Sequence, residues 1–251
     1  MSVLPKLMQI FRDHGYQPLT GYNSYFFQNH RYAPFTRLLS GDGQLLGHAG
    51  LALQEVMFIE GFRDYLAPKS VFAIGNAYGW SSIALSLIFP AARVAALDPL
   101  SEGIELTNSL ASENGLSLTA IVGSSPNDVA GTIERHLSGR IDLALIDAMH
   151  TNEAVLADFE AVQAAAHNET VFIFHDVMTW KLEDAMFAIR DKGYTLRILT
   201  RTPSGMAVVY RTAGAELDAY ISAFSDDPEF FRNYRKFVVE TYVDSVSKLV
   251  R

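Results

Sequence analysis

Residues 71–99 read VFAIGNAYGWSSIALSLIFPAARVAALDP, and this stretch predicts the fold of the chain. An apolar run ends at Gly75, a turn continues to Gly79, an amphipathic helix follows, and a second apolar run ends at Asp98. Glycine lets the backbone approach a ligand closely at such a turn, and a helix N-terminus offers free N–H groups to a negative group. An acid about 20 residues after the glycines can accept both hydroxyls of a ribose. The stretch therefore predicts a strand, turn, helix and strand that bind a cofactor containing adenosine.

The spacing of the glycines distinguishes between classes of cofactor. A dinucleotide-binding turn has the pattern G-x-G-x-x-G, but Ala77 and Trp80 occupy its second and third glycine positions. A nucleotide-dependent oxidoreductase is therefore a less favoured hypothesis. A phosphate-binding loop is excluded because Gly-Lys-Ser/Thr occurs nowhere in the chain. A strand-to-helix turn that binds no ligand is the remaining alternative.

Composition and charge exclude several classes of protein. The 251 residues are enough for one α/β domain with a sizeable core. Lys and Arg number 20 and Asp and Glu 28, and the net charge of −8 argues against binding to nucleic acid or an anionic membrane. The absence of cysteine excludes disulfides and thiol chemistry and fits a reducing compartment. Without a signal-peptide pattern or a membrane-length apolar stretch, we expect a cytoplasmic protein.

Strand and helix patterns alternate through residues 70–212, which we expect to be the cofactor-binding α/β core. Such alternation implies a mostly parallel sheet with helices on both faces. The last two strands are joined by RTPSG at 201–205, a Pro/Gly turn that predicts an antiparallel hairpin. The expected strands are Val71–Ile74, Arg93–Leu97, Ser117–Val122, Ile141–Ile146, Thr170–Phe174, Thr195–Thr200 and Met206–Tyr210. The expected helices between them are Ser82–Phe89, Gly103–Asn114, Pro126–Leu137, Asn152–Ala166 and Lys181–Lys192.

Two further regions flank the expected core. Residues 1–69 combine helical patterns at Val3–His14 and Leu51–Leu66 with an aromatic, Gly-rich segment at Gly21–Gly50, which is either a lid over a ligand or an irregular packed loop. Residues 213–251 are helical in pattern, and their aromatic stripe indicates core or a homodimer interface. The aromatic residues concerned are Tyr22, Tyr25, Phe26, Phe27, Tyr32 and Phe35 in the first region and Phe230, Phe231, Tyr234, Phe237 and Tyr242 in the second.

Ligands of an open α/β sheet lie beyond the carboxyl ends of its strands, so the residues that follow each strand are the candidates for function. After the third strand, Ser125 is expected to cap the next helix, with Pro126 as its first residue and Asp128 in its first turn. Ser125 could also lie near an adenine. The candidate cofactor-binding residues are Gly75, Asn76, Gly79, Ser81, Asp98, Ser125 and Asp147.

Ionisable residues follow the fourth and fifth strands. Asp147 and His150 come after the fourth, and His175 and Asp176 after the fifth. Burying a carboxylate is costly unless it is paired or binds a cation, so these residues indicate a functional site. The alternative is that the aspartates cap the following helices and that the histidines are solvated.

Two of these segments resemble a known family. IDLALIDAMHTNEAVLADFEAV at 141–162 and VFIFHDV at 171–177, with the turn at Gly75–Gly79, are similar to class I S-adenosylmethionine-dependent methyltransferases of the small-molecule, catechol O-methyltransferase-like type. The resemblance covers residues 51–211. It implies a doubly wound, seven-stranded sheet with a final antiparallel hairpin. It also implies that the glycine turn contacts the methionine part of the cofactor and that Asp98 holds the ribose.

The resemblance also implies a catalytic machinery. It places a divalent metal, such as Mg²⁺, on Asp147, His175 and Asp176, and a base on His150. A histidine can accept a proton near neutral pH, and a metal lowers the pKa of a bound hydroxyl. Because His175 stands where the family has an oxygen ligand, either a softer metal binds, or no metal binds and His175 is a second base or a substrate clamp.

A second departure from the family is Ala73, where an acid usually lies near the methionine amino group. Asp147, Glu55 or Glu60 could substitute for it; otherwise the chain is a non-catalytic cofactor-binding or regulatory protein. The negative charge and the absence of an Asn/Asp-Pro-Pro-Tyr/Phe motif disfavour a nucleic-acid methyltransferase. We therefore expect methyl transfer from S-adenosylmethionine to a small molecule, at a hydroxyl oxygen, with His150 or His175 as base.

Overall fold

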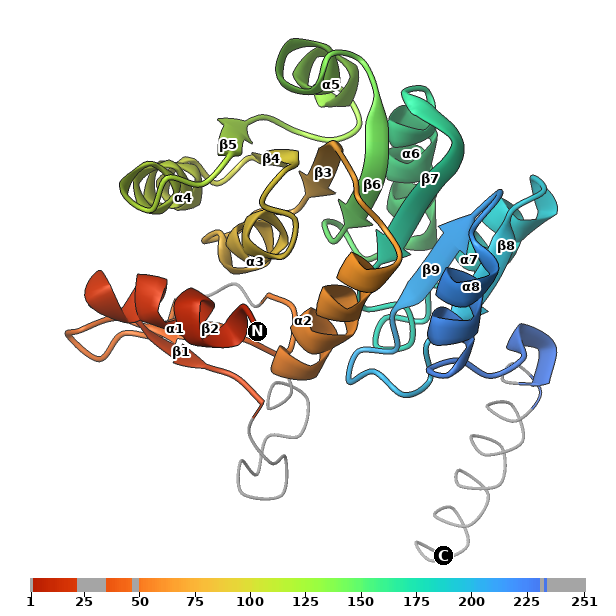
Figure 1. The fold of residues 1–251 in the computed structure, drawn as a ribbon, viewed down its shortest axis with the longest axis horizontal. Coiled ribbons are helices and arrows are strands. Elements are labelled where there is room, and N and C mark those ends of the chain that lie inside the picture. Colours follow the sequence, from red (N-terminus) through yellow and green to blue (C-terminus); the bar gives the residue numbers. More distant parts are fainter. Residues whose placement is uncertain (1, 22–34, 47–49, 231–232, 234–251) are drawn as a thin grey trace, which may run out of the picture.

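A seven-stranded sheet forms the centre of the chain (Figure 1). The computed structural model describes residues 2–21, 35–46, 50–230 and 233. The strand order is β5-β4-β3-β6-β7-β9-β8; β3 to β7 are parallel, and β9 is antiparallel to both of its neighbours. The predicted doubly wound sheet and its final hairpin are thus confirmed. The strands are β3 (Ser70–Ile74), β4 (Arg93–Asp98), β5 (Leu118–Val122), β6 (Ile141–Ile146), β7 (Ala166–Phe174), β8 (Thr195–Ile198) and β9 (Ala207–Tyr210).

Helices cover both faces of this sheet. In β3, Val71 and Ala73 pack into one apolar cluster, with α1 to α4 and α8, whereas Phe72 and Ile74 pack into a second, with α5 to α7. Because both faces are buried, the central strands are apolar throughout, as is typical of parallel sheets. The helices are α1 (Leu4–Asp13), α2 (Leu53–Glu60), α3 (Trp80–Ile88), α4 (Ser101–Glu113), α5 (Val129–Leu137), α6 (Asn152–Gln163), α7 (Glu183–Asp191) and α8 (Ala215–Ser222), and the 3-10 helix η1 (Gly61–Asp64) follows α2.

The N-terminal region packs beside α3. A short antiparallel pair, β1 (Gln17–Leu19) and β2 (Arg37–Leu39), was not predicted because each strand has only three residues. Trp80 of α3 ties this region to the core, since its ring lies 5.5 Å from that of Phe11 and its Nε1 donates to the Leu51 carbonyl at 2.9 Å. Within the described part of the chain, no helix is long and apolar enough to cross a membrane. The proposed lid aromatics Tyr22, Tyr25, Phe26, Phe27 and Tyr32, and Phe231, Tyr234, Phe237 and Tyr242 of the tail, lie outside the described residues.

Two predicted helix boundaries are wrong by three residues. The helix expected from Pro126 begins at Val129, because Asp128 accepts a hydrogen bond from the Ser124 amide at 2.8 Å and the backbone turns tightly between them. Ser125 is therefore not the N-cap, and Pro126 is not the first helical residue. The helix expected to reach residue 166 ends at Gln163 instead, because the chain at 166 already pairs with β6 as part of β7.

The topology brings the end of β3 against the end of β6, where the chain reverses its direction of winding. Gly75 follows β3 with φ +90°, and a Cβ at this position would lie 1.8 Å from the Asp147 carbonyl oxygen. Only glycine combines this backbone conformation with so close an approach. The turn after β3 and the end of β6 therefore lie closer together than any residue larger than glycine at position 75 would allow.

We expect Gly75→Ala to destabilise the protein far more than Gly193→Ala. Gly193 has a matching φ of +88°, but a Cβ there meets nothing within 4 Å. Gly193→Ala should therefore lower the free energy of unfolding only by the cost of a left-handed backbone, about 1–2 kcal/mol. Gly75→Ala adds a clash with the backbone of Asp147. It should lower the free energy of unfolding by at least about 3 kcal/mol or prevent folding. Urea unfolding monitored by circular dichroism measures both, and equal losses would contradict the packing described for Gly75.

Candidate functional site

The ends of five strands line one cavity of about 600 Å³, a size typical of small-molecule sites. It lies at the carboxyl edge of the sheet, where β3 is flanked by β4 on one side and β6 on the other. Among the predicted site residues, those that line it are Gly75, Asn76, Ser81, Asp98, Ser125, Asp147, His150, His175 and Asp176. Gly79 does not line the cavity. It precedes α3 with φ +89° and packs on Thr107, whose Oγ1 would lie 2.3 Å from a Cβ.

Asp98 at the end of β4 holds the turn that follows β3. Its Oδ2 accepts from the Ala77 amide at 2.8 Å, and its Oδ1 accepts from the Leu100 amide at 2.8 Å. Each carboxylate oxygen can accept a second hydrogen bond, so both remain able to bind hydroxyls in the cavity. The position and the remaining acceptor capacity are those required to hold a ribose.

Asn76 lines the cavity and has a buried acceptor that has no partner within the described residues. Its side chain is 2% exposed, and its amide donates to Thr107 Oγ1 at 2.8 Å and to the Ala77 carbonyl at 3.0 Å. Its Oδ1 is buried without a hydrogen bond. An unsatisfied buried acceptor costs about 1–3 kcal/mol. This cost would be relieved by a ligand that donates, such as the amino group of a methionine moiety.

Two of the three acids considered as substitutes at Ala73 lie away from the cavity. Glu55 is fully buried and accepts from His175 and Ser204, and Glu60 accepts from Ser2 and the Val3 amide. Asp147 does line the cavity. Asn76, which the sequence indicated as a cofactor-binding residue but not as a substitute for this acid, is a fourth possibility.

Asp158 of α6 is a further cavity residue that the sequence analysis missed. It is 3% exposed and accepts from the Ser125 hydroxyl across the cavity wall. Burial raises its pKa, and the hydrogen bond from Ser125 offsets this only partly. The sequence does contain a signal, since Asp158 lies at helical spacing from the buried Val155 and Val162 and is thus an acid on the apolar face of a helix.

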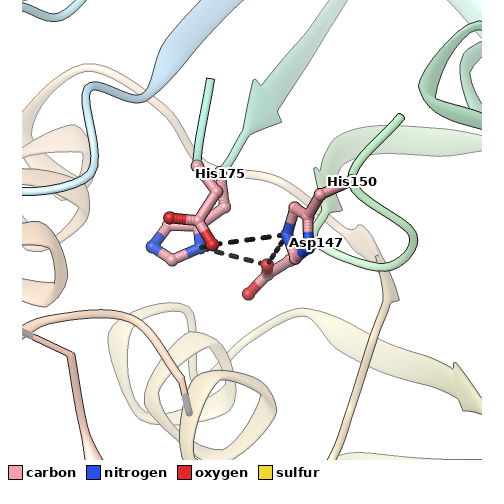
Figure 2. Close-up of side chains that lie close together, drawn as sticks. Asp147, His150 and His175 are labelled. Carbon is pink, nitrogen blue, oxygen red and sulfur yellow. Dashed lines mark hydrogen bonds and ion pairs between the residues drawn. The ribbon is translucent and has the colours of Figure 1, made fainter. Parts of the chain in front are cut away.

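The residues after β6 and β7 form a compact cluster beside this cavity. Figure 2 shows Asp147, His150 and His175 pointing toward one another. Asp147 Oδ1 lies 3.0 Å from His175 Nδ1 and 3.4 Å from His150 Nε2. Asp176 Oδ2 lies 3.3 Å from His150 Nε2 and 3.6 Å from His175 Nδ1. Four ionisable side chains from two adjacent strand ends therefore meet at one point.

Both ring nitrogens of His175 are engaged. Nδ1 faces Asp147, and Nε2 lies 2.8 Å from Glu55 Oε2 on the opposite side. Burial disfavours the charged ring, but the carboxylates of Asp147 and Glu55 outweigh it and raise the pKa of His175 well above its ordinary value. Burial likewise opposes ionisation of the two acids, yet the histidine charge holds the pKa of each below its ordinary value. His175 is therefore a protonated bridge between two carboxylates, and in this state it has no nitrogen with which to accept a proton.

His150 differs from His175 because it faces the open cavity. Its side chain is 26% exposed, against 3% for His175. Its ring stacks on Trp180, with centroids 5.6 Å apart and planes at 13°. Of the two histidines, His150 is the one that a ligand in the cavity can reach.

The capping alternative for the two aspartates is wrong. Thr151 caps α6 by accepting from the Ala154 amide at 3.2 Å, and α7 begins after Leu182 without a side-chain cap. Asp176 instead has a left-handed backbone with φ +59°, and its Oδ1 is buried without a partner in the described structure. Burial, only partly offset by His175, raises the pKa of Asp176. Strain and an unsatisfied oxygen at a cavity wall are typical of functional sites.

We expect Asp158→Asn to stabilise the protein at neutral pH. Because the folded-state pKa of Asp158 is raised, its ionised form costs stability above the ordinary aspartate pKa of about 3.9, and this cost disappears in acid. The variant should therefore unfold at higher urea than the wild type at pH 7 and at the same urea near pH 3.

Asp142→Asn is the opposite-sign control for this prediction. Burial opposes ionisation of Asp142, but the amides of Lys69 and Ser70 and the His167 side chain hold its pKa low. Its replacement should therefore lower stability at pH 7 and have no effect below the folded-state pKa. A loss of stability at pH 7 in Asp158→Asn would show that Asp158 contributes to the fold rather than to a ligand site.

Comparisons with known proteins agree with this geometry. Residues 72–177 match a family model described as a methyltransferase domain. No curated protein sequence matches the chain. The solved structures that it resembles include the O-methyltransferase TomG from Streptomyces achromogenes in complex with SAM, at 15% identity and a TM-score of 0.56 over 85% of this chain and 91% of that one.

Two other solved structures have similar scores. The O-methyltransferase from Bacillus cereus in complex with SAH is 17% identical, with a TM-score of 0.54 over 66% of this chain and 84% of that one. Precorrin 8w decarboxylase from Methanobacterium thermoautotrophicum is 17% identical, with a TM-score of 0.50 over 66% of this chain and 92% of that one. At these identities the likeness shows the fold alone, and the fold is shared by proteins named for different reactions. Residues 72–177 thus match a methyltransferase domain, and the chain shares its fold with these solved structures.

Proposed function

We propose that this protein transfers the methyl group of S-adenosylmethionine to a hydroxyl oxygen of a small molecule. The observation that carries the proposal is that Asp98 and the cluster of Asp147, His150, His175 and Asp176 line the same cavity. One end of the cavity thus offers a ribose site, and the other offers groups that can promote loss of a proton. A protein that only binds the cofactor does not need groups that promote loss of a proton.

Different residues of the cavity suit the ribose, the methionine part and the adenine of the cofactor. Asp98 would accept from the ribose hydroxyls, and the turn at Gly75–Ser81 would lie against the methionine part, with Asn76 Oδ1 accepting from its amino group. Ser125 and Asp158 would lie near the adenine, where Asp158 can accept from an exocyclic amine. When bound, S-adenosylmethionine supplies a methyl group on a positively charged sulfur, so the protein has chiefly to position the acceptor.

An oxygen acceptor must lose its proton, and two arrangements of the same residues favour this. In the first, His150 accepts the proton, because it faces the cavity while both nitrogens of His175 are engaged. In the second, Asp147, His175 and Asp176 would hold a divalent ion, which would supply positive charge that favours the ionised hydroxyl. The orphaned Asp176 Oδ1 and the convergence of the donor atoms fit such an ion.

Oxygen is favoured over nitrogen as the acceptor atom because a nitrogen acceptor needs less help from a base. The solved structures that resemble the chain include two, from Bacillus cereus and Streptomyces achromogenes, that are named as O-methyltransferases. Ala73 is the feature that favours the alternative, a protein that binds the cofactor without transferring its methyl group. The two experiments below distinguish these functions.

We expect Asp98→Asn to bind S-adenosylmethionine at least tenfold more weakly than the wild type. Loss of charged acceptors for the ribose hydroxyls should cost about 1.5–3 kcal/mol. Isothermal titration calorimetry measures this, with NAD as a second ligand that should not bind. Asp142→Asn is the matched control, because Asp142 also accepts from two backbone amides, of Lys69 at 2.7 Å and Ser70 at 3.0 Å, but away from the cavity. Equal affinity in both variants would contradict the assignment of the ribose site.

We expect His150→Gln to lower kcat for methyl transfer to hydroxyl acceptors by about 10²–10⁴ and to leave the affinity for S-adenosylmethionine unchanged. A panel of phenols, catechols and aliphatic alcohols, with amines for comparison, would be screened by release of S-adenosylhomocysteine with and without added divalent ions. His136→Gln in the last turn of α5 is the control and should retain full activity. Cofactor binding by the wild type without transfer to any acceptor would favour the non-catalytic alternative.

A further inference from the structure

The cluster at the ends of β6 and β7 has the spacing of a ready-made metal site. Asp147, His150, His175 and Asp176 each present one donor atom, and the four atoms lie within 4.8 Å of one another. The nitrogen-to-oxygen separations are 3.0, 3.3, 3.4 and 3.6 Å. Four ligands at about 2.1 Å from an ion in a tetrahedron are about 3.4 Å apart. The four nitrogen-to-oxygen separations are therefore close to those of a tetrahedral site, and the other two donor pairs lie within 4.8 Å.

Glu55 holds one of these donors in place from outside the cluster. It is fully buried, accepts from His175 Nε2 at 2.8 Å, and is itself held by the Ser204 amide at 2.9 Å and the Ala52 amide at 2.8 Å. With Nε2 donating to Glu55, the ring of His175 presents Nδ1 to the other three residues, and Nδ1 releases its proton to solvent when an ion binds. A carboxylate behind the far nitrogen of a histidine is the usual support of a metal-binding imidazole.

The remaining donors are also constrained toward this point. The ring of His150 is held in its plane by stacking on Trp180. Asp176 has φ +59° and a buried Oδ1 with no hydrogen-bond partner in the described part of the chain. Strained backbone and an unsatisfied oxygen persist only where the surrounding structure enforces them. The unsatisfied oxygen belongs to the carboxylate whose Oδ2 faces both histidines, so Asp176 keeps acceptor capacity for a positively charged ligand.

The chemistry of the donors determines which ion suits them. Mg²⁺ prefers six oxygen ligands at about 2.0–2.1 Å and keeps several waters, so two imidazoles suit it poorly. Imidazole nitrogen suits Zn²⁺, Co²⁺, Ni²⁺ and Fe²⁺, and a site with two nitrogens and two carboxylate oxygens is typical of these ions. We infer that Asp147, His150, His175 and Asp176 bind a divalent transition-metal ion in preference to Mg²⁺, with Glu55 as the positioning residue.

This inference deepens the proposed function, because it selects between the two ways of promoting proton loss. With the ion bound, His150 is a ligand and not the proton acceptor. It also sets this chain apart from the magnesium-type site that its resemblance implies, since two of the four donors are imidazoles. Metal binding needs neither cofactor nor acceptor, so it can be measured independently of methyl transfer.

Titration of the chelator-treated full chain with Co²⁺, Zn²⁺ and Mg²⁺ tests the inference. We expect one Co²⁺ per chain, with the visible absorption of a tetrahedral nitrogen–oxygen site, and affinity for Zn²⁺ and Co²⁺ at least about 100-fold greater than for Mg²⁺. Co²⁺ should also quench the fluorescence of Trp180, and Trp180→Phe should remove that quenching.

Variants distinguish the residues that bind the ion from Glu55, which positions His175. Asp147→Asn and His150→Gln should each weaken Co²⁺ binding at least tenfold and change the absorption spectrum. Glu55→Gln should weaken it about 10–100-fold, as loss of a supporting carboxylate does. Glu60→Gln is the control, because Glu60 lies on the same helix but accepts from the Val3 amide and not from the cluster. Circular dichroism and urea unfolding verify that each variant is folded.

Three results would overturn the inference: no Co²⁺ binding, Mg²⁺ binding as tight as Zn²⁺ binding, or full Co²⁺ affinity in His150→Gln. None of these would refute methyl transfer, which the first arrangement of the residues also allows. Conversely, tight Co²⁺ binding by a protein that transfers no methyl group would refute the proposed function and leave the metal site standing.

Discussion

A fully buried carboxylate, Glu55, constrains the arrangement of the whole site. A charge without exposure must be compensated inside the protein, and removing one partner of such a buried pair costs about 3–5 kcal/mol. Glu55 is compensated by His175 from the end of β7, by Ser204 from the β8–β9 connection, and by the Ala52 amide at the start of its own helix. Three segments that are distant in sequence therefore meet at the Glu55 carboxylate, and this contact fixes the orientation of the His175 ring.

The rest of the cavity follows from the winding of the sheet around β3. Parallel strands place Asp98 and Asp147 on opposite sides of the turn at Gly75, because β4 and β6 are the two neighbours of β3. We propose that the first acid binds the ribose; the second belongs to the cluster of histidines and acids. Glu55 and Ser204 lie outside residues 72–177, so the matched methyltransferase domain does not by itself contain the support of its own cluster.

How far the sequence predicts this site depends on where each residue lies. Asp98 and Asp147 directly follow apolar strands, so the edge of the sheet on which they lie could be predicted from the apolar pattern. The role of Ser125 could not, because the start of α5 depends on a hydrogen bond of Asp128. Glu55 was considered only as a substitute for the acid missing at Ala73, because its partners come from segments about 120 and 149 residues away. An acid on the apolar face of a helix indicates that a polar group packs against it, but the periodicity of the sequence does not identify that group.

The central claim is that one cavity holds the cofactor between Asp98 and the cluster that contains His150. A crystal structure of the protein with S-adenosylhomocysteine tests it most directly. The account predicts that the ribose hydroxyls lie within hydrogen-bond distance of Asp98 and that the sulfur faces the side of the cavity formed by Asp147 and His150. A ligand bound elsewhere, or bound with its adenine over the histidine cluster, would contradict it.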